Sequence, residues 1–380
     1  MACLYQLLVL GTPSTQQIAE VEELISQSLQ AFSLRLGEEV EWVINPATLE
    51  IKQQQSTAAV FFGGVNASQE NLQNLLQRNI PILPVVSDVT KVQEEIPAVL
   101  RSLGCLPYAT GGAQRVVTAL LECVGLLPSQ RRVFVSYRRD EARQTALQLF
   151  DELSSRLFDV FLDTHHITPS EDFQAMLWHR LCDSDVLIML DTPNYFESRW
   201  TSAEFGRALA KGIAILRVGW PDVIPSRRTD TTSHIGLLAE DVDQTTGQLT
   251  DRAIDQICYQ LEAVRSRGHA VRNLNLASHL RIAVEKIGGY VMGVGINKAM
   301  YLRLADGKDV VVYTTLSIPT SITLHHAARN SPNSSVAVVY DHVGLHPDWL
   351  EHLDWLGNQI SVVRWVKATD AAWCFADWEV

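Results

Sequence analysis

The sequence has no closely spaced pair of cysteines, which argues against both a zinc site and a disulfide framework. The six cysteines are scattered along the chain without a CxxC pair, and most lie in apolar surroundings, as buried free thiols do. They are Cys3, Cys105, Cys123, Cys182, Cys258 and Cys374. We therefore expect free thiols and no metal site.

Charged residues are also scarce, at 19% of the chain, so a long disordered charged tail is not expected. An excess of basic residues is missing too, because the net charge is -12. A general nucleic-acid-binding protein needs a basic face, so we expect no nucleic-acid partner. A local basic pocket for an anionic small molecule stays compatible with this charge.

Long hydrophobic runs are absent at the N-terminus. The segment MACLYQLLVLG has no basic stretch before its apolar run, and that run is too short to span a bilayer. It predicts a first β-strand instead. We expect a cytoplasmic protein without a membrane partner. At 47% hydrophobic residues, the chain has enough apolar side chains to form real cores.

The 380 residues predict more than one domain. Residues 1–127 alternate strand and helix patterns, which predicts a doubly wound α/β domain of Rossmann or flavodoxin-like type with a parallel sheet. A second α/β domain is expected at 131–267, closed by a helix over Asp251–Arg265. Residues 266–280 are interpreted as a linker, and 280–380 as a small third α/β domain.

The last segment carries three further patterns. The dipeptide Asp306-Gly307 between two apolar runs predicts a β-hairpin. A cluster of glycines predicts tight turns or a close approach of strands: Gly288, Gly289, Gly293 and Gly295. Tryptophans are dense, and both a packed core or interface and an aromatic ligand cage are open interpretations. They are Trp349, Trp355, Trp365, Trp373 and Trp378.

The second predicted domain is organised around one stretch. Val186–Leu190 is a short apolar run closed by Asp191-Thr192-Pro193, which predicts a buried strand. A helical pattern follows, in which Trp200 and Glu204 are four residues apart and share one face. In open α/β sheets, ligands bind beyond the carboxyl ends of the strands. The Trp200 and Glu204 pair is therefore a candidate active site.

This region resembles the Toll/interleukin-receptor (TIR) domain family in its bacterial form, over residues 131–267. Four motifs occur in family order. They are VFVSYRRDE at Val133–Glu141, FLDTHHITPSEDF at Phe161–Phe173, SDVLIMLDTPNYFESRW at Ser184–Trp200, and the WxxxE spacing of Trp200 to Glu204. The resemblance implies a flavodoxin-like parallel sheet.

The resemblance also implies an activity. Many TIR domains cleave NAD+ to nicotinamide and ADP-ribose or a cyclic product, so NAD+ would be a substrate and no separate cofactor is expected. The family's catalytic glutamate corresponds to Glu204. The loop Thr164–Asp172, which contains Ile167, would border the site and mediate TIR–TIR packing in a homo-oligomer. Bacterial members often act in anti-phage defence, which implies an activating partner or a small-molecule trigger.

A single carboxylate is chemically sufficient for this reaction. Nicotinamide leaves from a pyridinium and needs no proton, and the transition state resembles an oxocarbenium ion, as in glycoside hydrolysis. One glutamate can bind the ribose hydroxyls and stabilise the developing positive charge. Glu204 fits this role. The alternative is a helix-surface carboxylate paired with Arg207 or Lys211.

The neighbours of Glu204 each have two interpretations. Arg138 and Arg139 follow the first strand of this domain, where a guanidinium can bind the pyrophosphate bidentately or form a structural ion pair with Asp163 or Glu141. Trp200 would wall the pocket or pack in the core.

Other neighbours are less specific. Tyr137 would line the pocket or simply pack, and Asp163 is a candidate substrate contact or an anchor of the loop. Asn194 and Tyr195 are interpreted as turn residues.

Two rival functions remain at this stage. A non-catalytic TIR scaffold would assemble through the Thr164–Asp172 loop, and a nucleotide sensor would bind a signal in a flanking domain.

Overall fold

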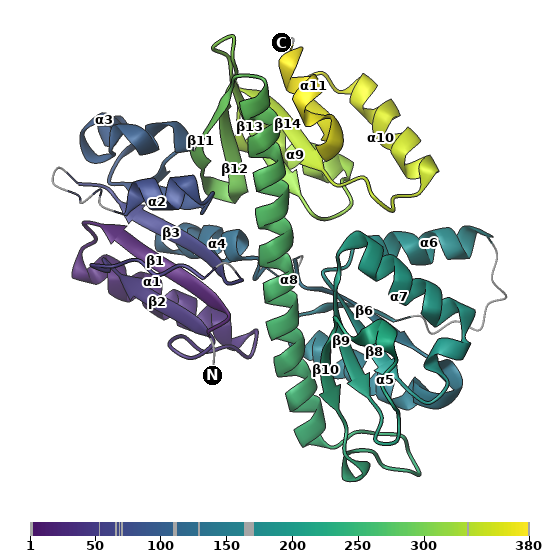
Figure 1. Ribbon diagram of the computed structural model, residues 1–380. Coiled ribbons are helices and arrows are strands. Elements are labelled where there is room, and N and C mark those ends of the chain that lie inside the picture. The colour runs from purple at the N-terminus through teal and green to yellow at the C-terminus, as the bar shows by residue number, and fades with distance from the viewer. Residues whose placement is uncertain are drawn as a thin grey trace. The chain divides into compact units, whose positions relative to one another are not determined.

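The computed structural model describes residues 3–52, 54–64, 67, 69, 71–108, 112–127, 130–162, 171–332 and 334–378. They form two compact units (Figure 1). The first comprises 1–127, 270–342 and 347–380, and the second comprises 128–269 and 343–346. Each predicted α/β segment contributes one five-stranded sheet. The mixed α/β class is confirmed, while the exact boundaries of three domains stay a prediction.

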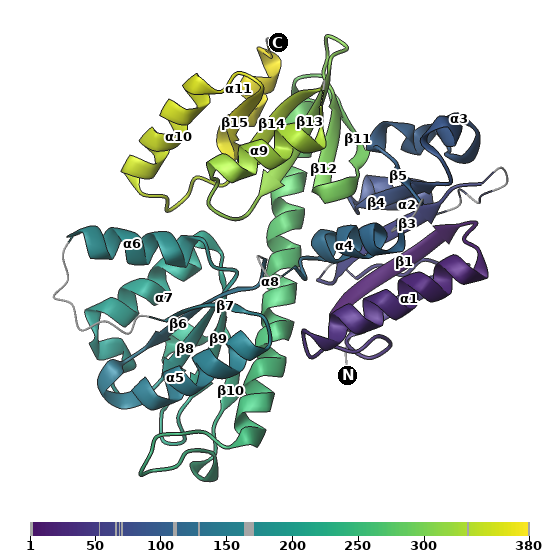
Figure 2. The same ribbon diagram turned by 180° about the vertical axis from the view of Figure 1, so that it is seen from behind.

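The N-terminal sheet is parallel, with the order β2-β1-β3-β4-β5. Its strands are β1 (Tyr5–Gly11), β2 (Val40–Ile44), β3 (Ser56–Phe62), β4 (Ile82–Val86) and β5 (Leu106–Pro107). Its helices are α1 (Thr15–Gln30), α2 (Leu72–Gln77), α3 (Val92–Glu95) and α4 (Gly112–Val124). Helices α1 and α4 contact one another on one face, and the apolar side chains of α2 pack on the other (Figure 2).

One helix beside this sheet differs from its prediction, and one predicted helix cap cannot be compared with the structure. The sequence of Lys91–Leu103 by itself predicts one helix, but Pro97 separates α3 from a 3-10 helix at Ala98–Leu103. The sequence also predicts Ser68 as the N-cap of a helix that continues through Leu76; Ser68 lies outside the described residues, and α2 begins at Leu72.

The second unit has a sheet with the order β10-β9-β8-β6-β7, parallel throughout. Its strands are β6 (Arg132–Tyr137), β7 (Asp159–Leu162), β8 (Val186–Asp191), β9 (Ala214–Gly219) and β10 (Ser233–Gly236). Its helices are α5 (Arg139–Ser155), α6 (Glu171–Cys182), α7 (Arg199–Lys211) and the first part of α8 (Asp251–Lys286). Counted along this unit, the strand order is 2-1-3-4-5, the flavodoxin-like order.

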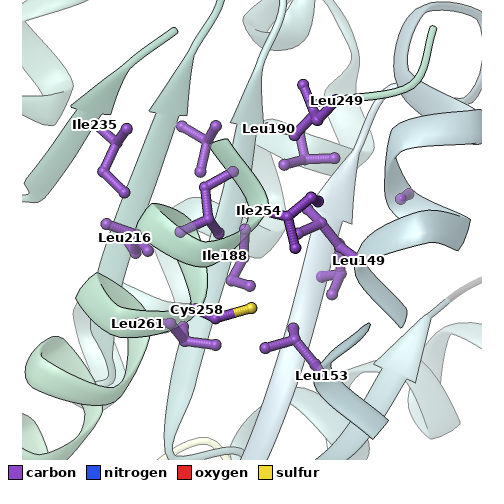
Figure 3. Close-up of a cluster of buried hydrophobic side chains, with 14 of the residues drawn as sticks. Leu149, Leu153, Ile188, Leu190, Leu216, Ile235, Leu249, Ile254, Cys258 and Leu261 are labelled. Carbon is purple, nitrogen blue, oxygen red and sulfur yellow. The ribbon is translucent and has the colours of Figure 1, made fainter. Parts of the chain in front are cut away.

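Successive side chains of these strands point to opposite faces of the sheet, and each face has its own hydrophobic core. Val133 and Val135 of β6 face the side of α5 and α8, where Leu149, Ile254 and Leu261 complete a large apolar cluster (Figure 3). Phe134 faces the other side, with residues of α6 and α7. Both faces are covered, which explains the nearly continuous apolar sequence of β6 and β8.

Helix α8 corrects one prediction. The helix expected to end at Arg265 continues to Lys286, so residues 266–280, interpreted as a linker, are helical. The side chains of Leu276, Leu280 and Val284 pack in the core of the C-terminal sheet. Polar residues in 266–280 conceal this apolar spacing in the sequence.

The C-terminal sheet is mixed, with the order β11-β12-β13-β14-β15. Its elements are β11 (Tyr290–Val294), β12 (Ala299–Arg303), β13 (Asp309–Thr315), α9 (Ser321–Asn330), β14 (Ser335–Tyr340), α10 (Pro347–Gln359), β15 (Val363–Lys367) and α11 (Ala371–Ala376). β12 and β13 form the predicted hairpin, and β13, β14 and β15 are parallel. The short helix α11 was not predicted.

The glycine prediction for this sheet is confirmed. Gly288 has a φ of +82°, and a Cβ atom on Gly289 would lie 2.8 Å from the Arg303 carbonyl oxygen of β12. The tryptophans of this segment differ in burial: Trp378 is buried, whereas Trp355 and Trp373 are 58% and 79% exposed. A packed core therefore accounts for only part of the tryptophan cluster.

No described helix is long and apolar enough to cross a membrane. In the same part of the chain, no group of three or more His, Cys, Asp or Glu side chains is arranged to hold a metal ion. All six cysteines are free thiols, as expected.

Candidate active site in the second unit

Helix α7 positions Glu204. The helix begins at Ser198, whose hydroxyl accepts hydrogen bonds from the backbone N–H groups of Trp200 and Thr201, and it ends at Gly212, which has a φ of +69°. Its buried face is formed by Thr201, Glu204, Phe205 and Ala208. Glu204 is only 7% exposed. The interpretation of Glu204 as a helix-surface carboxylate is therefore wrong.

One buried hydroxyl group bonds the Glu204 carboxylate, and a second hydroxyl group bonds the first. The Ser136 hydroxyl, near the carboxyl end of β6, donates to Oε2 of Glu204. The Ser136 and Tyr195 hydroxyl oxygens are 2.6 Å apart. A serine hydroxyl has a single proton, so a Ser136 that donates to Glu204 must accept from Tyr195. The result is a hydroxyl chain from Tyr195 through Ser136 to Glu204.

The protonation of Tyr195 agrees with this direction. Complete burial raises the pKa of the Tyr195 phenol well above its ordinary value, and the nearby charge of Glu204 raises it further. Tyr195 therefore remains a hydrogen-bond donor at neutral pH. Its backbone is held as well, because the Thr201 hydroxyl donates to the Tyr195 carbonyl oxygen.

The sequence analysis did not predict this hydroxyl chain. Tyr195 was expected to be a turn residue, yet it is fully buried, and no role was predicted for Ser136, which is buried as well. A signal was present in β6, because Ser136 is the one hydroxyl residue in the buried run Val133–Ser136 and alternation places it on the same face as Phe134. A buried hydroxyl needs a hydrogen-bond partner.

Arg138 lies at the same end of the sheet, in a polar network. It is the N-cap residue of α5, and its Nη1 donates to the Asn194 carbonyl oxygen at 2.8 Å. Its guanidinium also lies 3.5 Å from carboxylate oxygens of Glu141 and Glu197. The structural ion pair with Glu141 is thus confirmed, while a substrate contact of Arg138 stays a prediction.

Glu141 fixes the loop that carries Asn194. Its Oε1 accepts from the Asn194 side chain at 2.6 Å, and its Oε2 accepts from the Asn194 backbone N–H at 3.3 Å. Burial raises the pKa of the Glu141 carboxyl, but the hydrogen bonds from Asn194 and the charge of Arg138 outweigh it and lower the pKa. Glu141 is therefore an anion that orders this loop.

A buried ion pair lies at the carboxyl end of β8. The Arg217 Nε of β9 donates to Asp191 Oδ2 at 2.6 Å, and both side chains are at least 95% buried. Burial raises the pKa of Asp191, and Arg217 partly opposes that change. The pair leaves the carboxyl end of β8 polar although its interior is apolar.

The other predicted site residues are distributed differently. Trp200 is half-buried, with the Arg199 guanidinium 4.4 Å from its ring centroid, and it stands on α7 one turn before Glu204. Arg139 is the first residue of α5. Tyr137 packs in the core on the α5 and α8 side of the sheet, opposite to Ser136 and Glu204. The structure therefore does not bring Tyr137 to the carboxylate.

Part of the predicted site cannot be placed. Asp163 and Ile167 lie outside the described residues, as does the loop up to Ser170. Their predicted substrate contacts, and the role of the loop in packing, stay predictions.

The sheet order and the buried carboxylate agree with the family that the motifs indicate. Residues 133–256 match the family model described as "TIR domain". This part of the chain is a TIR domain. The flanking sheets lie outside the matched residues. Glu204 and the hydroxyl chain belong to the TIR domain itself.

Similarity to whole proteins adds little to this assignment. No curated protein matches the chain. One solved structure, a probable two-component system response regulator/GGDEF domain protein, is 14% identical over 71% of this chain and 99% of its own, with a TM-score of 0.23. A putative protein of the same description is 15% identical over 68% of this chain and 99% of its own, with a TM-score of 0.24. Neither score supports an argument about fold or function.

Proposed function

We propose that the TIR domain cleaves NAD+ at the bond between the nicotinamide nitrogen and C1′ of the ribose. The bonding electrons leave with the pyridinium nitrogen, so nicotinamide departs as a neutral molecule. A water oxygen then bonds to C1′ and loses one proton, which yields ADP-ribose. If a group of the ADP-ribosyl moiety attacks C1′ instead, the product is cyclic.

One observation carries this proposal: a nearly buried glutamate at the family's catalytic position, held by a chain of two hydroxyl groups. A buried carboxylate is costly unless hydrogen bonds compensate it, and such groups concentrate at functional sites. Ser136 and Tyr195 hold the Glu204 carboxylate in one orientation. A fixed negative charge is what an oxocarbenium-like transition state requires.

The residues around Glu204 would divide the remaining tasks. Arg138 and Arg139 lie at the carboxyl end of β6, where a guanidinium can bind the pyrophosphate. Trp200 is half-buried one helical turn from Glu204 and would form a wall for an aromatic ring. Arg138 would exchange its contact with Glu197, which is 70% exposed, for a phosphate. Asp163 and Ile167 would complete the site from the adjacent loop.

The test compares wild type with Glu204→Gln at several protein concentrations. Purified full-length chain is incubated with NAD+, and nicotinamide, ADP-ribose and cyclic products are separated by chromatography. We expect turnover by the wild type and a loss of at least about 100-fold in Glu204→Gln. The matched control is Glu240→Gln, because Glu240 is 80% exposed in the same unit. Undiminished turnover in Glu204→Gln would refute the assignment.

Labelled water separates the two product classes. In H2 18O, hydrolysis places one 18O atom on C1′ of ADP-ribose, whereas cyclisation incorporates none. The same experiment therefore decides between a glycohydrolase and a cyclase.

A non-catalytic interaction module is the second candidate, and the burial of Glu204 favours it. A carboxylate that is 7% exposed and already bonded to Ser136 is compatible with a structural role. In that case Glu204→Gln lowers stability, no variant or wild-type preparation releases nicotinamide, and the chain still self-associates. A role in anti-phage defence is proposed for either candidate, with a partner or small molecule as trigger.

A further inference from the structure

The first unit contains a cavity of about 310 Å³ that is far from the TIR motifs in sequence. Five separate regions line it: the segment before β3, the turn before β4, the end of α4, residues 270–277 of α8, and the ends of β11, β12 and β13. It lies at the amino ends of β3 and β4, opposite to the strand ends where such sheets usually bind ligands. The volume is in the range of small-molecule sites.

The charge of this cavity is opposite to that of the chain. Lys52, Arg78 and Lys298 line it, and no carboxylate does among its described lining residues. Lys52 and Arg78 are exposed, and the Arg78 guanidinium lies 3.5 Å from the Ile51 carbonyl oxygen. In a protein of net charge -12, Lys52 and Arg78 give this cavity a local excess of positive charge that attracts an anion, while Lys298 also interacts with the Glu122 carboxyl next to the lining residue Cys123.

The cavity also has a buried acceptor that has no hydrogen-bond partner among the described residues. Gln55 is 8% exposed, and its Nε2 donates to the carbonyl oxygens of Cys3 and Tyr5, each at 3.2 Å. Within the described residues, Gln55 Oε1 accepts no hydrogen bond. A buried unpaired acceptor is costly, so a ligand that donates to Gln55 Oε1 would recover that free energy.

The backbone beside Lys298 is strained. Asn297 and Lys298 have φ values of 56° and 55°, in the left-handed region, which is uncommon for a lysine. The hydrogen bond from the Gly295 N–H to the Ala299 carbonyl oxygen, 2.9 Å long, closes this turn. Strain of this kind concentrates where side chains are held for a ligand. Here it holds a cation at the cavity.

The remaining lining residues are uncharged, and they include both apolar and polar side chains. Arg281 donates to Asn79 Oδ1, so Asn79 lines the cavity with that acceptor already used. The apolar wall is formed by Ile51, Ile80, Pro81, Leu274, Val294 and Met300. The lining therefore combines this apolar wall with three cations, the Gln55 amide and further hydroxyl and amide groups, which are those of Ser56, Thr57, Asn273 and Thr314.

We propose that this cavity binds a nucleoside phosphate, with the phosphate at Arg78, Lys52 and Lys298 and the base against the apolar wall. A base amino group or a ribose hydroxyl donates to Gln55 Oε1. This site is distinct from the TIR domain, and its occupancy does not depend on NAD+ cleavage.

The test measures binding to the full-length chain by thermal shift and calorimetry. The probes are adenosine and guanosine monophosphates, their 3′,5′-cyclic forms, the two unphosphorylated nucleosides, and inorganic phosphate. We expect at least one nucleotide to raise the Tm, and its parent nucleoside and phosphate to bind at least about tenfold more weakly. Absence of any nucleotide shift at millimolar concentration would overturn the proposal.

Two variants locate the binding. Arg78→Gln and Gln55→Leu should each raise the Kd by about tenfold or more, while Arg329→Gln, an exposed arginine on α9, should leave it unchanged. Because Gln55 is buried, circular dichroism is used to verify that the Gln55→Leu variant folds. If that variant does not fold, the Arg78→Gln variant decides the result, because Arg78 is exposed. Binding that is unaffected by Arg78→Gln contradicts the site. Binding retained in Glu204→Gln separates it from the TIR site.

Discussion

The Ser136 hydroxyl of β6 donates a hydrogen bond to the Glu204 carboxylate of α7, and so joins a strand end to a helix face 68 positions away in sequence. Ser136 is 1% exposed and Glu204 is 7% exposed, so little solvent can replace this bond. The orientation of the carboxylate therefore depends on a single hydroxyl group and on Tyr195 behind it.

Ser136→Ala should weaken both stability and NAD+ cleavage. Loss of a hydrogen bond to a buried carboxylate costs about 1.5–3 kcal/mol of unfolding free energy. The freed carboxylate should also lower kcat by about tenfold, because its orientation is no longer fixed. Urea unfolding and nicotinamide release measure the two effects. The control is Ser155→Ala, whose hydroxyl is exposed at the end of α5. An unchanged kcat would show that Ser136 does not position Glu204.

Arg138→Gln tests whether this arginine also contacts the substrate. If it binds the pyrophosphate, KM for NAD+ should rise by about tenfold or more with a smaller change in kcat. Arg143→Gln, on the exposed side of α5, is the matched control. A lower Tm with an unchanged KM would mean that Arg138 only holds Asn194 and Glu141.

Two glycines of α7 should respond to alanine in opposite directions. Gly206 is exposed inside the helix with nothing near its missing Cβ, so Gly206→Ala should stabilise the unit by about 0.5–1 kcal/mol. Gly212 ends the helix at a φ of +69°, so Gly212→Ala should destabilise it by about 1 kcal/mol. Thermal unfolding of both variants measures the difference. Equal shifts would contradict the described end of α7.

Stability in acid should depend on Glu262. The carboxylate of this α8 residue forms ion pairs with Nη2 of Arg131 at 2.6 Å and with Nη2 of Arg265 at 2.7 Å. All three side chains are buried. Burial opposes ionisation of Glu262, but the two guanidinium groups outweigh it and lower its pKa to about 2. In the unfolded chain the Glu262 carboxyl titrates near its ordinary pKa of 4.5. The stabilisation is therefore present above pH 4.5 and is lost as the pH falls towards 2.

The Glu262→Gln variant isolates this contribution. At pH 7 it should lose about 3–5 kcal/mol of unfolding free energy, because two buried cations lose their anion. The gap between variant and wild type should close as the pH falls towards 2. A gap that is constant between pH 6 and pH 3 would exclude this linkage.

Assembly should govern the activity. We expect the specific rate of NAD+ cleavage to rise with protein concentration, because TIR sites are often completed by a neighbouring copy and the loop containing Ile167 would supply that contact. Sedimentation over the same concentrations should show oligomers forming where the rate rises. A specific rate that is constant across a hundredfold dilution series would contradict this expectation.

The amino-acid order alone determined much of the TIR domain. Short apolar runs located β6 and β8, and the spacing of Trp200 and Glu204 placed a carboxylate on α7, because these signals arise within one element. Local turn chemistry likewise located the hairpin at Asp306-Gly307. The continuation of α8 to Lys286 was missed, since its apolar positions acquire meaning only against the C-terminal sheet.

Only the tertiary structure decided what surrounds Glu204 and what forms the cavity of the first unit. Tyr195 was expected to be a turn residue, and it lies buried beside Ser136 because two parallel strands end at the same edge of the sheet. Gln55, Arg78 and Lys298 come from segments with no common motif. Hydrogen bonds and charges between distant segments leave no period in a sequence, so such contacts appear only once the chain has folded.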